Sequence, residues 1–143
     1  MKKTLFILGL ISVFSLQVNA QNQDGMKQTV EYLASQELGG RFPATAGDTL
    51  ASEYLAGKLR SLKLKRVVRE RKNKGFYQDF SFGKENPKNA HNIIAVLPGK
   101  DKHLRHEYIL VGAHYDHLGM GGEKSGSRRP DTLGVHPGGD ANA

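Results

Sequence analysis

Cysteine and tryptophan are both absent from this 143-residue chain. Without cysteine there is no disulfide framework and no thiolate zinc site, so any bound metal must be held by histidine and carboxylate side chains. Lys and Arg outnumber Asp and Glu by 21 to 14, which gives a formal net charge of +7. Basic runs at 63–66 and 69–72 could form a patch for nucleic acid or a membrane surface. Since no aromatic interleaving or nucleic-acid motif accompanies them, we interpret them as a solvated face and expect no nucleic-acid partner.

Long apolar runs are scarce, and the main one lies at the start of the chain. A basic Met1-Lys2-Lys3 precedes a largely apolar stretch at 4–16, and Val18-Asn19-Ala20 supplies small residues for a signal peptidase. This pattern predicts a secretory signal peptide over 1–20, cleaved after Ala20, and an exported protein, periplasmic or extracellular. The alternative is a retained anchor. Because the run is shorter than the roughly 20 residues that span a bilayer, we expect no stable membrane anchor.

The remaining residues, 21–143, show the pattern of one α/β domain with a mixed central sheet flanked by helices. Apolar spacing, with Asp24 and Asp48 as capping residues, predicts helices near 26–38 and 49–62. Strands are predicted near 66–68, 76–82, 92–97 and 108–112, with a polar turn at 84–88. We expect the strands at 92–97 and 108–112 to be adjacent and central. Such strands need neighbours and helices on both faces, so we also expect the domain to be truncated.

The most specific pattern lies at the end of the last predicted strand. The apolar run Tyr108 to Val111 leads through Gly112-Ala113 into His114 and Asp116. Ligands of open α/β sheets bind at the carboxyl ends of strands. A metal-binding histidine commonly gives its second ring N–H to a carboxylate, which a His-x-Asp spacing allows. The long polar loop that follows, 119–143, favours a functional site over an ordinary surface histidine.

These residues resemble a known family. Gly112-Ala113-His114-Tyr115-Asp116 and the later Pro137 to Ala143 are similar to two motifs of the secreted di-zinc aminopeptidases, which are related to glutamate carboxypeptidases and glutaminyl cyclases. Leu33 to Arg41, Ala51 to Leu64 and Asn92 to Gly99 match earlier pieces of the same pattern. The resemblance covers essentially all of the chain after residue 24, and its specific part is 92–119. It implies a zinc-exopeptidase-like fold.

The resemblance also implies roles for individual residues. His114 matches the family's first zinc ligand, and Asp116 matches the catalytic carboxylate that orients it. The family's bridging ligand is the second acid of an Asp-Asp pair; here Asp140 aligns with the first acid and Ala141 with the second. A one-residue shift would make Asp140 the bridge, so we take Asp140 as a candidate metal ligand. A complete site of this family holds two Zn²⁺.

The function that the resemblance implies is removal of N-terminal residues from peptides by an exported zinc aminopeptidase. Two zinc ions about 3.5–4 Å apart would share a carboxylate and a water in such a site. The motifs of this chain supply no general base, so we expect the chain itself to be inactive. Two alternatives stay open: a glutaminyl-cyclase-like zinc acyltransferase with one zinc, and a non-catalytic homologue. The preferred residue of the substrate and the oligomeric state are not indicated.

Overall fold

The computed structural model describes residues 23–67 and 75–139. The predicted signal peptide and Asp140 lie outside these ranges. The chain divides into two units, Met1–Glu31 and Tyr32–Ala143. Helix α2 (Gln23–Leu33) begins in the first unit with Asp24 in its first turn, where a carboxylate interacts favourably with the helix dipole. This confirms the first predicted helix, although the helix ends at Leu33 and a short 3₁₀ helix, η1 (Gln36–Leu38), follows it.

Helix α3 (Ala46–Ser61) begins slightly earlier than the sequence predicted. The N-cap is Thr45, whose hydroxyl accepts a hydrogen bond from the Asp48 backbone N–H at 3.4 Å. The Asp48 carboxylate reaches back and accepts from the Ala44 N–H at 3.0 Å. Both side chains therefore satisfy N–H groups that a helix start leaves without partners. The N-cap is thus Thr45 and not the predicted Asp48, which lies inside the first turn.

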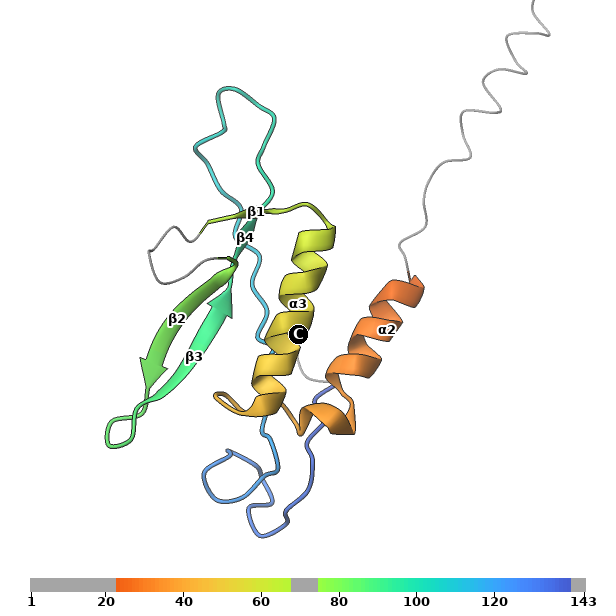
Figure 1. Ribbon diagram of the computed structural model, residues 1–143, viewed down its shortest axis with the longest axis vertical. Coiled ribbons are helices and arrows are strands. Elements are labelled where there is room, and N and C mark those ends of the chain that lie inside the picture. Colours follow the sequence, from red (N-terminus) through yellow and green to blue (C-terminus); the bar gives the residue numbers. More distant parts are fainter. Residues whose placement is uncertain (1–22, 68–74, 140–143) are drawn as a thin grey trace, which may run out of the picture. The chain divides into compact units, whose positions relative to one another are not determined.

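The strands form two short antiparallel sheets instead of the predicted central sheet. β2 (Tyr77–Phe82) pairs with β3 (Lys88–Ile93) in a hairpin, and β1 (Lys65–Arg66) pairs with β4 (Ala95–Val96). The hairpin turn coincides with the predicted polar turn (Figure 1). The predicted strand at 92–97 is divided at Ile94 between β3 and β4, and the Ile94 N–H donates to the Phe76 carbonyl at 2.7 Å, in register with the pairing of β2 and β3. The fold is thus a small mixed α/β arrangement.

The prediction of a buried strand at 108–112 was wrong. These residues have no regular secondary structure, and Ile109 and Leu110 are 95% and 93% exposed. A strand exists through hydrogen bonds to a neighbour, and within 23–67 and 75–139 no strand lies beside this segment. An apolar run is therefore compatible with a strand but does not create one.

A small core forms where α3 packs against η1 and β3. Its apolar members, all nearly inaccessible to solvent, are Leu38, Ala51, Ala56, Phe76 and Ala90. Arg41, Asp48 and Ser52 are buried as well. Buried polar groups require hydrogen-bond partners, and Arg41 finds them in the backbone carbonyls of Leu33, Tyr115 and Pro137. In the described part of the chain, no helix is both long enough and apolar enough to cross a bilayer.

Candidate metal site

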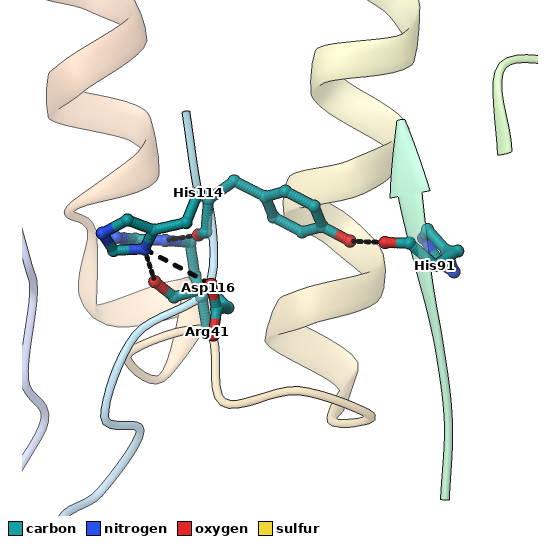
Figure 2. Close-up of polar contacts among 5 residues, drawn as sticks. Arg41, His91, His114 and Asp116 are labelled. Atoms are coloured by element: carbon teal, nitrogen blue, oxygen red, sulfur yellow. Dashed lines mark hydrogen bonds and ion pairs between the residues drawn. The ribbon is translucent and has the colours of Figure 1, made fainter. Parts of the chain in front are cut away.

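The turn at 114–116 is held from two sides through its central residue. The Tyr115 hydroxyl donates to the backbone carbonyl of His91, on β3, at 2.9 Å (Figure 2). The Tyr115 carbonyl accepts from Nε of Arg41 at 2.7 Å. Both partners are distant in sequence, so the turn is positioned by tertiary contacts. The two flanking side chains, His114 and Asp116, are half exposed.

His114 and Asp116 adopt the arrangement expected of a metal-binding histidine and its orienting carboxylate. Nδ1 of His114 lies 3.0 Å from the Asp116 backbone carbonyl and 3.3 Å from Oδ1 of its carboxylate (Figure 2). A backbone carbonyl oxygen and an ionised carboxylate oxygen can only accept hydrogen bonds. Nδ1 must therefore carry the proton. In the neutral imidazole the lone pair then lies on Nε2. That nitrogen is the one available to a metal ion.

The phenol of Tyr115 stays protonated and acts as a donor. Burial raises the pKa of Tyr115 well above its ordinary value, and the nearby carboxylate of Asp48 raises it further. Both effects disfavour the phenolate, the first by desolvation and the second by repulsion. The neutral hydroxyl therefore keeps its bond to the His91 carbonyl across the physiological pH range, and the turn stays attached to β3.

Arg41 is a buried residue whose side chain links three separate segments of the chain. It is only 4% exposed. Besides the Tyr115 carbonyl, its guanidinium donates from Nη1 to the carbonyls of Leu33 and, at 2.9 Å, of Pro137. Burial lowers the pKa of Arg41, and the Asp116 carboxylate acts in the opposite direction. Figure 2 shows Arg41 beside Asp116 and His114. The planar, permanently charged guanidinium group suits this position, because its N–H groups point in fixed directions and can donate to several carbonyl oxygens at once.

Backbone hydrogen bonds bring the same three segments together. The His117 N–H donates to the Arg41 carbonyl at 3.0 Å, and the Gly119 N–H donates to the Gly40 carbonyl at 2.9 Å. The His136 N–H then donates to the Gly119 carbonyl at 2.9 Å. Segment 40–41 thus lies beside 117–119, which lies beside the segment of His136. We call these three stretches, 40–41, 117–119 and 134–138, the Arg41 junction.

The remaining predicted ligand lies outside the described residues. Asp140 follows Pro137 by three positions, and its placement is not described. The rings of His117 and His136 lie near each other, with centroids 6.4 Å apart. Across residues 23–67 and 75–139, no three side chains of His, Asp or Glu gather in a metal-binding cluster. The described part of the site is therefore one histidine with its orienting carboxylate.

An open groove of about 740 Å³ lies in the same unit, beside the segment that follows the turn. Its apolar lining includes Phe42, Leu118 and Met120. The sequence did not predict this groove, because the residues on its two sides are far apart in the chain.

Comparisons with protein-family models, with curated proteins and with solved structures gave no match.

Proposed function

We propose that this chain contributes the first ligand turn of an exported zinc-dependent aminopeptidase, with His114 as a Zn²⁺ ligand and Asp116 as its orienting carboxylate. The observation that supports the proposal best is the double contact of Nδ1 with Asp116, which leaves the lone pair of the neutral ring on Nε2. Half exposure of both side chains leaves room for a metal and a substrate. The family resemblance identifies Asp140 as the companion ligand.

The donor chemistry of the turn suits zinc. Zn²⁺ accepts neutral imidazole nitrogen and carboxylate oxygen, and a cysteine-free chain can offer only those ligands. When bound, zinc would polarise a peptide carbonyl and lower the pKa of a bound water toward about 7. The contribution of Asp116 is to keep Nδ1 protonated and the ring in one orientation, which raises the basicity of Nε2. Tyr115 keeps the whole turn attached to β3 through its bond to His91.

Peptides are the substrates that we propose. The open groove beside the segment that follows the turn offers Phe42, Leu118 and Met120 as an apolar surface, which suits the side chain of a peptide residue. A predominantly apolar groove with few polar groups is the usual form of a small-ligand site.

Zinc titration of the full chain, followed by isothermal calorimetry, tests the proposal. We expect weak zinc binding by the wild-type chain and none by His114→Ala. Replacement of the exposed His103 by Ala is the matched control, and it should leave the titration unchanged. Equal zinc affinity in the wild-type chain and in His114→Ala would overturn the assignment of His114.

A further inference from the structure

Positive charge is concentrated in two stretches of the chain that β1 and β4 bring together. Residues 58–67 hold five Lys or Arg and no Asp or Glu, and residues 98–107 hold three Lys or Arg against two acids. Outside these stretches, the described residues hold ten acids and only seven Lys or Arg. β1 lies in the first stretch and pairs with β4, which directly precedes the second. Both stretches therefore lie at the C-terminal end of α3 (Figure 1), and we call them the basic end.

The basic side chains of this end are presented to solvent. Lys58 is half-buried, and the other seven are exposed: Arg60, Lys63, Lys65, Arg66, Lys100, Lys102 and Arg105. Within residues 23–67 and 75–139, none of these eight forms an ion pair with a carboxylate. Their charge is therefore available to an anionic partner.

Large apolar side chains are exposed between the basic ones. Leu62, Leu97 and Leu104 are 68%, 81% and 55% exposed. The turn that carries Leu104 has a defined structure, because the Asp101 carboxylate accepts from the backbone N–H groups of His103 at 2.7 Å and of Leu104 at 3.0 Å. Apolar side chains beside Lys and Arg are typical of protein surfaces that bind the interface of an anionic bilayer.

We propose that the basic end binds reversibly to the surface of an anionic phospholipid bilayer, with its Lys and Arg side chains at the headgroups and its exposed leucines at the edge of the acyl region. The basic run at 63–66 was interpreted from the sequence as a solvated face, because neither the pairing of β1 with β4 nor the exposure of the leucines is visible there. A nucleic acid fits this surface less well, since the basic end has no Phe, Tyr or Trp on which a base can stack. Such peripheral binding needs no membrane-spanning helix and does not depend on the zinc site.

Co-sedimentation of the full chain with lipid vesicles tests the role of charge. We expect binding to vesicles of phosphatidylcholine and phosphatidylglycerol in equal parts and far weaker binding to phosphatidylcholine alone, and high salt should remove this difference by screening. The variant Lys63→Gln/Lys65→Gln/Arg66→Gln should bind the anionic vesicles at least about 10-fold more weakly, since one Lys or Arg near such a surface accounts for about 5-fold. The apolar stretch at 4–16 is the same in every variant, so differences between variants report on the basic end.

The matched control removes the same charge from exposed positions elsewhere in the chain. Lys124→Gln/Arg128→Gln/Arg129→Gln should bind the anionic vesicles nearly as well as the wild-type chain. Lys100→Gln/Lys102→Gln should weaken binding, and because these positions lie outside β1 and β4, its effect does not require loss of that pairing. Equal weakening by the control and by the variants of the basic end would assign the binding to net charge and overturn the basic end as the site.

Substitution of the leucines distinguishes a bilayer from a soluble polyanion. Leu97→Ser/Leu104→Ser should weaken binding to anionic vesicles about 10-fold through the loss of apolar contact, and it should leave binding to heparin unchanged. Leu133→Ser, at a position 75% exposed in another loop, is the control and should affect neither. Vesicle binding that does not depend on the two leucines would replace the bilayer by a soluble polyanion as the partner. Equal binding to anionic and neutral vesicles would overturn the inference altogether.

Discussion

At the scale of single residues, the protonation of His114 follows from its two acceptor neighbours on Asp116. Both contacts, at 3.0 and 3.3 Å, require the proton on Nδ1. We predict that long-range ¹H–¹⁵N correlation spectra of the metal-free chain at neutral pH show the Nδ1–H tautomer for His114. The exposed His103 provides the reference signal. A His114 ring with its proton on Nε2 would contradict the geometry of the turn.

The charge of Asp116 should matter for metal affinity. Asp116→Asn preserves an oxygen that accepts from Nδ1 but removes the negative charge, so the ring becomes a weaker ligand. We expect zinc affinity to fall about 10–100-fold, measured by competition with a chelating dye. Replacement of Asp131, an exposed carboxylate of the following loop, by Asn is the control and should leave the affinity unchanged.

Tyr115 should contribute to stability through one hydrogen bond. Tyr115→Phe removes the donor to the His91 carbonyl while preserving the ring, so we expect the free energy of unfolding to fall by about 0.5–1.5 kcal/mol. Chemical denaturation measures this change. Tyr108→Phe, at a position 77% exposed, is the matched control and should have little effect. Equal losses for the two variants would argue against the bond to β3.

At the scale of elements, the close approach of 40–41 to 117–119 depends on a glycine. A Cβ at Gly40 would lie 2.4 Å from the Gly119 carbonyl oxygen and 2.7 Å from that of His136, and φ is +74°. We expect Gly40→Ala to destabilise the chain by at least about 1 kcal/mol, because the backbone itself must shift. Gly57→Ala, inside α3 with nothing within 4 Å, should instead stabilise it by about 0.5–1 kcal/mol. Thermal denaturation of the two variants checks that Gly40→Ala lowers the stability and that Gly57→Ala raises it.

Local patterns predicted the helices and strand β2 better than the sheet. Capping residues and apolar spacing located α2, α3 and β2 because these signals act over a few neighbouring positions. The segment at 108–112 was mispredicted because strand formation depends on a partner elsewhere in the chain. The His114–Asp116 turn was predicted because both residues lie within it. The hydrogen bonds from Arg41 to the Tyr115 and Pro137 carbonyls were missed because these acceptors lie 74 and 96 positions away.

At the scale of the whole molecule, the exposed segment Tyr108 to Val111 is where we expect one molecule to associate with another. Its side chains are β-branched, aliphatic or aromatic, and 77–95% exposed. Extended apolar segments with unpaired backbone groups promote pairing between molecules. We predict that the chain self-associates at high protein concentration and that Leu110→Lys reduces this association, as measured by sedimentation velocity. Arg128→Lys is the neutral control, and a monomeric wild-type chain would contradict the prediction.

The molecule as a whole should lack peptidase activity even with zinc. A co-catalytic site needs about three protein ligands per metal and an open water position, whereas the proposed ligands of this chain are only His114 and Asp140, and its motifs contain no general base. We expect no turnover of aminoacyl-anilides by the full chain with added zinc. Turnover that a chelator abolishes would show that the motif register was misjudged.

The central claim is that His114 binds zinc through Nε2 while Asp116 holds Nδ1. The most direct measurement is a zinc titration of the ¹⁵N-labelled chain followed by long-range ¹H–¹⁵N correlations of the imidazole nitrogens. We predict that Nε2 of His114 shifts on zinc addition while Nδ1 keeps its proton, and that Asp116→Asn requires more zinc for the same shift. A titration in which the His114 nitrogens stay unchanged, or in which Nδ1 responds as the ligand, would contradict the account.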